Sequence, residues 1–471
     1  MMSDRSTAEP GAERHQCLFV AHTFPPIAAV GIYRTLRFME NLPDFGWEGM
    51  VLSMKEEAVV GYPIDHSLCS RIPAGAIVER VGVWRLLDRG IEWIKRICHP
   101  RKNNSGQPPA DAEVAAGEQQ EDSPRGFLSG AKRRLVSLRE IVFYTPDDCA
   151  NWIGPAVIAG CRMVCQHRPQ VIVSTGPPHS AHLVGLGICL LTRTPLVLDL
   201  RDPWACDEWR LREDPKVRNW LQKRMESLCV RFASRVVLNT ERLKREFVVA
   251  YPKKHADTFV TIPNGVDDRS AAPIRQYLQE AREGPPGEAP ILCHPGSIYR
   301  HRSLLPLIDA VEQLKASQER VLLEQIGGVD DPPDLAARLL RRNLLEVKLW
   351  GQQSHETTLR RMAAADILIV IQPISTLQVA AKLYEMLLFQ KPILVLTGEG
   401  AIADFIREYR VGMLADPNDP EQIAQVIRQL LQMLRKGSST GDWERARADY
   451  DTHHLTGKLA AVLDGAIARS R

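Results

Sequence analysis

Short apolar runs alternate with longer amphipathic stretches through most of this chain. The first apolar run, 17–21, precedes polar and proline residues, and from 31 to 42 the residues Ile32, Leu36 and Met39 recur at helical spacing. Strands that alternate with helices are typical of parallel sheets covered by helices. The pattern therefore predicts an α/β protein. The predicted strands of this first half are 17–21, 50–53, 171–174, 196–200 and 235–239, and the predicted helices are 31–42, 179–191 and 217–232.

A second series of the same kind begins at residue 291. Between the two series, residues 271–290 include Pro285, Pro286 and Gly287 and predict an interdomain linker. A length of 471 residues also suggests two or three domains at roughly 150 residues each. The predicted strands of the second series are 291–294, 321–327, 347–350, 367–371, 392–396 and 412–414, and the predicted helices are 303–315, 334–342, 355–364, 379–389, 401–409 and 420–434.

Two segments lack the large apolar residues that a core requires. Residues 1–14 predict a disordered tail, and residues from about 100 to 125, rich in Pro, Gly, Gln and acids, predict a disordered insertion. The chain is therefore expected to contain an N-terminal domain at 15–270, the linker at 271–290 and a C-terminal domain at 291–442, followed by helices at 443–471.

Composition and charge narrow the function classes. Apolar residues make up 44% of the chain and charged residues 25%, which predicts a soluble globular protein. The net charge is only +3, so no whole-protein electrostatic case exists for a nucleic-acid partner. The ten cysteines show no zinc-ligand spacing, which indicates free thiols in a reducing compartment. We find no signal peptide and no apolar run long enough to span a bilayer, and we predict a cytoplasmic protein.

Two basic amphipathic stretches flank the predicted insertion. Residues 84–97 and 127–142 mix Trp, Leu and Ile with Arg and Lys at helical spacing. Such stretches can lie on an anionic membrane surface, which would place the protein at the inner face of the membrane. Ordinary surface helices docked on the domain are the alternative interpretation.

Candidate chemistry lies in the loops after the predicted strands, because ligands of open α/β sheets bind at the carboxyl ends of the strands. No dinucleotide, P-loop, zinc-protease or serine-hydrolase motif is present. In the first half, Gly31 at a helix start suits an anion, His179 and His182 share a helix face, and Arg201 and Asp202 follow a strand. A tight turn, incidental histidines and structural ion pairing are the respective alternatives.

The second half contains a turn and a helix with phosphate-binding chemistry. Gly296 follows a strand and precedes Arg302, whose guanidinium can bind two phosphate oxygens. Lys382 and Glu385 lie on one helical face, where the carboxylate can accept hydrogen bonds from ribose hydroxyls. Solvated arginines and a surface ion pair are the alternatives.

Together these segments resemble glycosyltransferase family 4 and its relatives with the GT-B fold, in which two Rossmann-like, doubly wound parallel-sheet domains face a central cleft. The resemblance covers nearly the whole chain apart from the predicted tail and insertion, and it rests on the order and spacing of several stretches. These are FPPIAAVGIYRTLRF, VIVSTGPPHSAHLVGL, PLVLDLRDPW, VVLNTERLKREF, VTIPNGVD, HPGSIYRHRSLLPLIDAV, MAAADILIVI and AAKLYEMLLFQKPILVLTGEG.

The resemblance implies a retaining glycosyltransferase that needs no metal or other cofactor. Such an enzyme moves a sugar from a nucleotide-diphosphate sugar to a hydroxyl of a glycan or lipid-linked acceptor, as in cell-surface or exopolysaccharide synthesis. The C-terminal domain would bind the nucleotide sugar and the N-terminal domain the acceptor, with the helices at 443–471 returning to the N-terminal domain.

The same resemblance suggests roles for individual residues. The expected catalytic residues are Arg302, Lys382 and His182. The expected donor-binding residues are Gly31, Gly296, Arg302, Lys382 and Glu385, and the expected lining of the acceptor or sugar pocket is Tyr33, His179, His182, Arg201 and Asp202.

Three departures from the family pattern leave other functions open. Leu377 stands where the family has the first glutamate of its E-x7-E motif, Ala28 and Ala29 stand where relatives often have two glycines, and Ser297 replaces a common arginine. A catalytically inactive GT-B scaffold or binding subunit of a polysaccharide assembly complex is one alternative. A nucleotide-sugar 2-epimerase, which shares the fold, is another.

Overall fold

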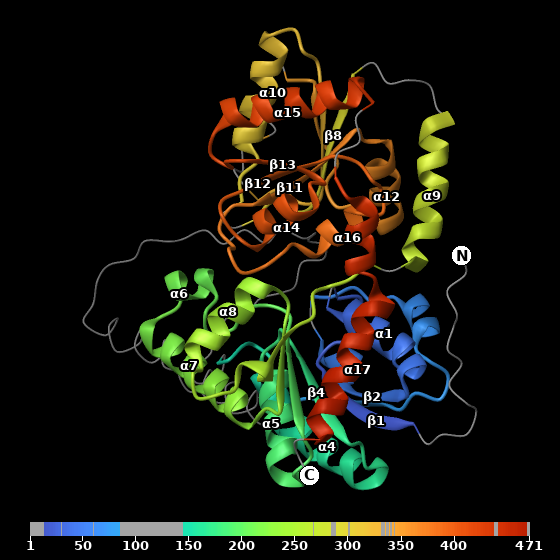
Figure 1. Ribbon diagram of the computed structural model, residues 1–471, viewed down its shortest axis with the longest axis vertical. Coiled ribbons are helices and arrows are strands. Elements are labelled where there is room, and N and C mark those ends of the chain that lie inside the picture. The colour runs from blue at the N-terminus through green and yellow to red at the C-terminus, as the bar shows by residue number, and fades with distance from the viewer. Residues whose placement is uncertain are drawn as a thin grey trace, which may run out of the picture.

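The computed structural model has two lobes, one above the other in Figure 1, each with a single parallel sheet. The predicted insertion at 100–125 and the tail at 1–14 except Arg14 lie outside the described residues, as do the basic stretches at 84–97, except Trp84, and 127–142. The described residues are 14–29, 31–59, 61–84, 145–266, 268–283, 289–299, 302–330, 335, 339, 342, 344–437 and 441–468.

The N-terminal sheet has seven parallel strands in the order β3-β2-β1-β4-β5-β6-β7. Successive residues of the central strand point to opposite faces, so Cys17 and Phe19 join one apolar cluster while Leu18 and Val20 join the other. Burial on both faces explains why these strands read as continuous apolar runs. The strands are β1 (His15–Ala21), β2 (Trp47–Met54), β3 (Val78–Val81), β4 (Val171–Gly176), β5 (Leu196–Leu200), β6 (Arg235–Leu238) and β7 (Phe259–Thr261).

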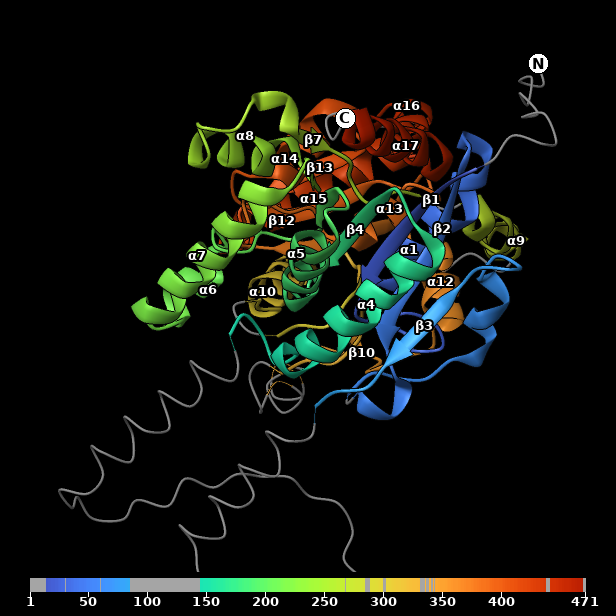
Figure 2. The ribbon, with the colours of Figure 1, turned by 90° about the horizontal axis from the view of Figure 1, so that it is seen from below.

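Helices cover both faces of this sheet. Figure 2 shows α4 and α5 together on one side of the strands. The helices are α1 (Ile32–Asn41), α4 (Ile153–His167), α5 (Ser180–Thr192), α6 (Glu208–Glu213), α7 (Lys216–Phe232) and α8 (Glu241–Ala250), with 3-10 turns at Leu42–Phe45, Glu56–Ala58, His66–Arg71, Ala150–Trp152 and Ala256–Thr258.

The C-terminal sheet has six parallel strands in the order β10-β9-β8-β11-β12-β13. Leu368 and Ile369 on the central strand again belong to different apolar clusters, one on each face. The strands are β8 (Ile291–Pro295), β9 (Leu322–Ile326), β10 (Val347–Leu349), β11 (Ile367–Gln372), β12 (Ile393–Thr397) and β13 (Gly412–Ala415), and the helices are α9 (Asp268–Glu283), α10 (Leu305–Ala316), α12 (His355–Ala364), α13 (Ala381–Met386), α14 (Ala401–Tyr409), α15 (Pro420–Arg435) and α16 (Trp443–Asp449).

The predicted linker at 271–290 differs from the structure over most of its length. Residues 268–283 form α9, which packs against α12, and its residues Ala271 and Ile274 are buried in a C-terminal core cluster. The proline and glycine residues at the end of this segment suggested a linker, whereas the helical spacing of its apolar residues governs the structure. The chain therefore crosses between the domains before α9, after β7.

The chain returns to the N-terminal domain through its last helix, α17 (Thr452–Ala468), which lies against α1 (Figure 1). Leu455, Leu459 and Leu463 of this helix are buried in an N-terminal core cluster. Of the segment 443–471 that was expected to return, α16 differs: its buried Trp443 belongs to the C-terminal core, so this helix stays with the C-terminal domain.

The two crossings between the domains run side by side. Val266 forms a parallel bridge with Asp451, and its N–H donates to the carbonyl of Tyr450 at 2.7 Å. Two hydrogen-bonded segments, rather than one free linker, thus connect the lobes.

A buried ion pair connects the first crossing to the sheet. Nη2 of Arg34, on α1, lies 2.8 Å from Oδ1 of Asp199 on β5, and Arg34 also donates to the carbonyls of Ile262 and Pro263 at 2.8 and 2.7 Å. Burial acts to raise the pKa of Asp199, but the charge and hydrogen bonds of Arg34, with a hydrogen bond from Thr175, hold this pKa below its ordinary value. Asp199 is therefore a charged structural group.

We predict that Asp199→Asn destabilises the protein strongly, because it leaves the buried guanidinium of Arg34 without a countercharge. The expected loss of unfolding free energy is about 3–5 kcal/mol, measured by chemical denaturation. Glu399→Gln, which breaks the exposed pair with Arg407, is the matched control and is expected to change stability little. Equal effects of the two variants would contradict this role of the buried pair.

Candidate functional site

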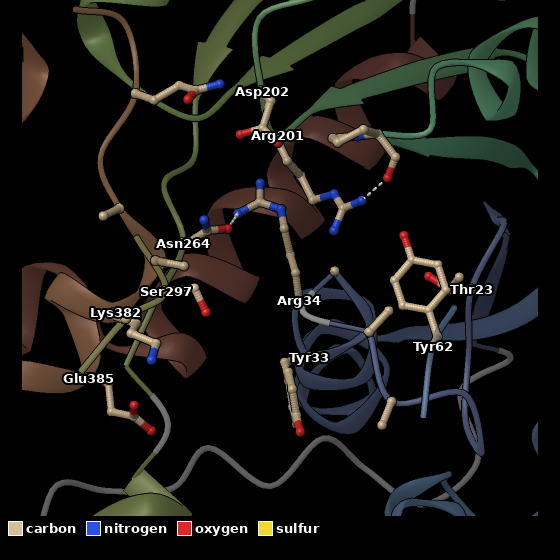
Figure 3. A pocket seen from close by; sticks show the side chains of 18 of the residues that line it. Thr23, Tyr33, Arg34, Tyr62, Arg201, Asp202, Asn264, Ser297, Lys382 and Glu385 are labelled. Carbon is tan, nitrogen blue, oxygen red and sulfur yellow. Dashed lines mark hydrogen bonds between the residues drawn. The ribbon is translucent and has the colours of Figure 1, made fainter. Parts of the chain in front are cut away.

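A cleft of about 1990 Å³ separates the two domains and is lined by residues of both. Loops that follow β1, β4 and β5 contribute one wall, and loops that follow β8, β9 and β11 contribute the other. Figure 3 shows Lys382 and Glu385 across the cleft from Tyr62 and Thr23. Eight of the ten predicted site residues line it, namely Gly31, Tyr33, Arg201, Asp202, Gly296, Arg302, Lys382 and Glu385.

The C-terminal wall carries two cations beside one carboxylate. Lys382 and Glu385 lie one turn apart on α13, and the guanidinium carbon of Arg302 is 4.9 Å from the ring centre of Tyr299. Burial lowers the pKa of Lys382 and the charge of Arg302 lowers it further, against the opposing effect of Glu385. Two neighbouring cations attract an anion, and their chemistry suits a diphosphate.

Hydrogen bonds of buried side chains position the turn beneath these cations. Nδ1 of His294 lies 2.7 Å from Oε1 of Gln325, whose Nε2 donates to the carbonyl of Gly296 at 2.6 Å. Gly327 has a φ of +119°, and a Cβ there would lie 2.8 Å from the backbone of Gly296 and Ser297. The loops after β8 and β9 therefore pack backbone to backbone, which requires glycine at 327.

Glu385 faces the cleft with a partner that the sequence analysis missed. Its Oε1 lies 3.4 Å from Nε2 of His355, the first residue of α12, and its side chain is 25% exposed. A carboxylate at this place can accept hydrogen bonds from a diol. His355 gave no sequence signal beyond its position at a helix start.

On the N-terminal wall, Arg201 lies across the start of α1. Its Nε donates to the carbonyl of Gly176 at 3.3 Å, and Nη2 donates to the carbonyl of Pro177. The Arg201 guanidinium occupies the space that a Cβ at Gly31 would take, so the guanidinium lies directly against the backbone of Gly31. Gly31 lines the cleft at this helix start, and its predicted contact with the donor stays a prediction.

Asp202 lies next to Arg201 on the same wall, as Figure 3 shows. Burial raises the pKa of its carboxyl, and the neighbouring Arg201 opposes that rise. Asp202 therefore places an acidic side chain beside the Arg201 guanidinium on the N-terminal wall.

The structure corrects the predicted roles of His179 and His182. Both side chains are buried, with exposed fractions of 1% and 0%, and neither lines the cleft. His179 stacks on Trp204 with ring centres 4.9 Å apart, and Nδ1 of His182 lies 3.0 Å from Oγ of Ser174. Both histidines follow Pro177 and Pro178, which line the cleft. The histidines therefore pack in the core beneath the N-terminal wall.

Several residues of the N-terminal wall had no assigned role in the sequence analysis. His22 and Thr23 directly follow β1, and their polarity after a buried strand was the available signal. Tyr62, Asp147 and Asp148 come from irregular segments, where no periodicity marks a position.

Among the described residues, one group combines three potential metal ligands: Asp147, Asp148 and Cys149, whose ligand atoms lie within 4.8 Å. The carboxylate of Asp147 already accepts hydrogen bonds from the backbone and hydroxyl of Ser180. Burial raises the pKa of the Cys149 thiol, and Asp147 and Asp148 raise it further. Because a thiol binds metal as thiolate, we interpret the group as an anchor of residues 147–149 on α5.

Leu377, at the place of the missing glutamate, forms part of the contact between the domains. Its carbonyl accepts a hydrogen bond from Oγ1 of Thr240 at 2.7 Å, and its side chain packs against an apolar cluster of the N-terminal domain. Nearby, Nη2 of Arg242 lies 2.7 Å from Oδ1 of Asp404. The loop after β11 therefore helps to hold the two walls in their present arrangement.

We predict that His182 makes the protein less stable in mild acid. Burial lowers its pKa to about 3, whereas the unfolded chain takes up this proton near the ordinary value of 6.5. Because the unfolded state then binds more protons, stability falls as the pH drops below the ordinary value, by about 2 kcal/mol at about pH 5.

His182→Asn should remove this part of the pH dependence. Urea denaturation at about pH 7 and about pH 5 measures it, and the variant is expected to lose about 2 kcal/mol less than the unmutated protein between them. If the variant and the unmutated protein lose the same unfolding free energy between the two pH values, His182 has the same pKa in the folded and unfolded states and the prediction is wrong.

Comparisons with known proteins agree with this geometry. Residues 289–433 match the model of the family described as glycosyl transferases group 1. A search of curated proteins found no match. Among the described residues, no helix combines the length and apolar character that crossing a bilayer requires.

Solved structures share the two-domain architecture at low sequence identity. HepE of Anabaena in complex with UDP is 16% identical, with a TM-score of 0.60, 96% of this chain and 99% of that chain covered. Sucrose-phosphate synthase from Thermosynechococcus elongatus is 15% identical, with a TM-score of 0.62 and 95% and 98% covered. WaaG, a glycosyltransferase involved in lipopolysaccharide biosynthesis, is 14% identical, with a TM-score of 0.55 and 95% and 99% covered.

At these identities the structural likeness shows the fold, and the family model adds the enzyme class. Both predictions from the sequence, the GT-B fold and the glycosyltransferase class, are confirmed. The chain accordingly has the GT-B fold, and its C-terminal domain matches the family of glycosyl transferases group 1 over residues 289–433.

Proposed function

We propose that this protein moves a sugar from a nucleotide-diphosphate sugar to a hydroxyl of a glycan or lipid-linked acceptor, with retention of the anomeric configuration. The observation that carries the proposal is the group formed by Arg302, Lys382 and Glu385 on the C-terminal wall of the cleft. This wall belongs to the domain that matches the glycosyltransferase family. Structures of HepE with UDP and with UDP-glucose support a nucleotide sugar as donor.

The donor would be bound mainly by the C-terminal domain. Arg302 and Lys382 would contact the diphosphate, next to the turn at Gly296. Glu385 would accept hydrogen bonds from the two ribose hydroxyls, with His355 placing its carboxylate. The proposal includes no metal or cofactor, because the two cations offer the positive charge that the diphosphate requires.

The reaction would depend on electrostatic stabilisation of the leaving group. The bond between the anomeric carbon and the diphosphate oxygen breaks as the acceptor oxygen bonds to that carbon on the same face. The acceptor proton passes to the departing phosphate oxygen. Negative charge grows on the diphosphate during this step, and fixed cations such as Arg302 and Lys382 stabilise it without reorganisation. A closed cleft also limits hydrolysis of the donor.

The acceptor would bind on the N-terminal wall. Tyr33, Tyr62, Arg201 and Asp202 present hydroxyl and charged groups there, across the cleft from Lys382 and Glu385 (Figure 3). Such groups suit the hydroxyls of a sugar. We propose a cytoplasmic protein that acts at the inner face of the membrane in cell-surface or exopolysaccharide synthesis.

An inactive binding subunit is the second candidate, and Leu377 is the observation that favours it. With an apolar side chain engaged between the domains, this position offers no carboxylate to the donor sugar. Such a subunit would bind nucleotide sugars without hydrolysing or transferring them, so turnover separates the two candidates.

We predict that Glu385→Gln weakens nucleotide binding by about 10-fold to 100-fold, because hydrogen bonds to a charged acceptor contribute about 1.5–3 kcal/mol. Isothermal titration calorimetry with UDP, GDP and ADP measures the affinity. Glu421→Gln, an exposed carboxylate at the start of α15, is the matched control and should bind normally. If the protein binds none of these nucleotides, the proposed donor site is wrong.

We predict that Arg302→Met lowers sugar transfer by about 100-fold to 1000-fold, the usual effect of removing one fixed donor at a developing negative charge. Arg302→Lys, which keeps the charge, should recover part of the activity. Release of nucleotide from the sugar donor provides the assay, and circular dichroism shows whether each variant folds. Unchanged turnover in the methionine variant would exclude Arg302 from this role.

A further inference from the structure

Helix α7 presents apolar and basic residues to solvent, while its inner side combines the apolar Cys229 and Val230 with the polar Gln222 and Glu226. On its inner side, Nε2 of Gln222 donates to the carbonyl of Pro146 at 2.7 Å, and Glu226 accepts hydrogen bonds from the N–H of Ala205 at 2.8 Å and the hydroxyl of Tyr251 at 2.6 Å. A helix at the surface of a globular domain ordinarily presents polar and charged residues to solvent on its outer side. Packing of the domain therefore does not account for the apolar residues on the outer side of α7.

The outer side of α7 has four large apolar residues. Val217, Trp220, Leu228 and Phe232 are 57%, 55%, 45% and 41% exposed. At about 100° per residue, they lie on one half of the helix circumference. Exposed large apolar residues gathered on one side of a helix are typical of an interaction site.

Basic residues share this outer side, and acidic residues do not. The exposed residues of α7 are Lys216, Val217, Trp220, Lys223, Arg224, Leu228, Arg231 and Phe232, which we call the α7 face. Its charged members are all cationic. The guanidinium carbons of Arg224 and Arg231 lie 5.3 and 5.8 Å from the ring centres of Trp220 and Phe232. Aromatic rings next to arginines, with an apolar strip beside them, suit the boundary between lipid headgroups and acyl chains.

The position of α7 connects this face to the cleft. Glu208 and Arg210 of the preceding helix, α6, line the cleft, and α7 follows after two residues at the edge of the N-terminal domain (Figures 1 and 2). The α7 face therefore belongs to the helix that directly follows cleft-lining residues of the N-terminal wall in the chain.

We propose that the α7 face is a docking site for an anionic lipid bilayer. Cationic side chains would interact with the headgroups, while Val217, Trp220, Leu228 and Phe232 enter the interfacial layer. The inference rests on the proposed function in one respect: a lipid-linked acceptor would reach the cleft from the membrane that the α7 face binds. It is also distinct from the basic stretches at 84–97 and 127–142, because α7 lies elsewhere in the chain.

Co-sedimentation of the full chain with vesicles tests this proposal. We expect binding to vesicles of phosphatidylcholine mixed with phosphatidylglycerol and much weaker binding to phosphatidylcholine alone. Arg224→Gln with Arg231→Gln should weaken binding to the anionic vesicles roughly 30-fold, because each basic residue near an anionic surface contributes about 1 kcal/mol. Trp220→Ser with Phe232→Ser should also weaken it.

Arg435→Gln with Lys436→Gln is the matched control, since it removes the same charge from an exposed segment of the C-terminal domain. This control should bind vesicles like the unmutated protein. Three results would overturn the proposal. The unmutated protein does not bind anionic vesicles, the α7 variants bind them as tightly as the unmutated protein, or the control variant loses as much binding as the α7 variants. A dimer in sedimentation velocity that the serine variant dissociates, without vesicle binding, would instead assign the face to a second copy of the chain.

These measurements need no nucleotide and no turnover. Their outcome is therefore separate from that of the calorimetry on Glu385, which tests the donor site. Circular dichroism of each variant shows whether lost binding reflects lost folding.

Discussion

The buried contact between Arg34 and Asp199 determines how the N-terminal domain meets the rest of the molecule. One guanidinium joins the first helix, the end of a central strand and the carbonyls of Ile262 and Pro263, where the chain leaves the domain. Asp199 is also two residues from Arg201, so the same contact positions a wall of the cleft. A buried charge pair has a large desolvation cost, and here additional hydrogen bonds from Arg34 and Thr175 offset it.

The two walls of the cleft differ in how they are built. The donor wall consists of loops packed backbone to backbone, with Gln325 connecting His294 to Gly296. Contacts between the walls include the partly exposed ion pair of Arg242 with Asp404 and the packing of Leu377 against the N-terminal domain. Partly exposed ion pairs contribute little stability, so this pair adds little to the contact between the lobes. This combination suits an enzyme that must admit a donor and then exclude water.

Periodicity predicted the two sheets well, because strands buried on both faces must be apolar throughout. It also placed Lys382 and Glu385 on one face of a helix, where the structure has them. The predictions that were wrong concern residues whose burial depends on contacts with segments far away in the sequence. His179 and His182 lie at the start of α5, the helix expected to carry them, yet both are buried and neither lines the cleft. The segment with α9 looked like a linker because its end is rich in proline and glycine, and residues in irregular segments, such as Tyr62, have no pattern to find.

The position of α17 affects the order in which the protein can mature during synthesis. Leu455, Leu459 and Leu463 are core residues of the domain that contains the beginning of the chain. On the ribosome, that domain lacks the part of its core that α17 supplies until α17 has been translated, whereas the C-terminal sheet and most of its helices are translated earlier. Domains usually fold in order from the N-terminus. Here the domain that emerges first completes its core last, and its apolar surface beside α1 remains uncovered in the meantime.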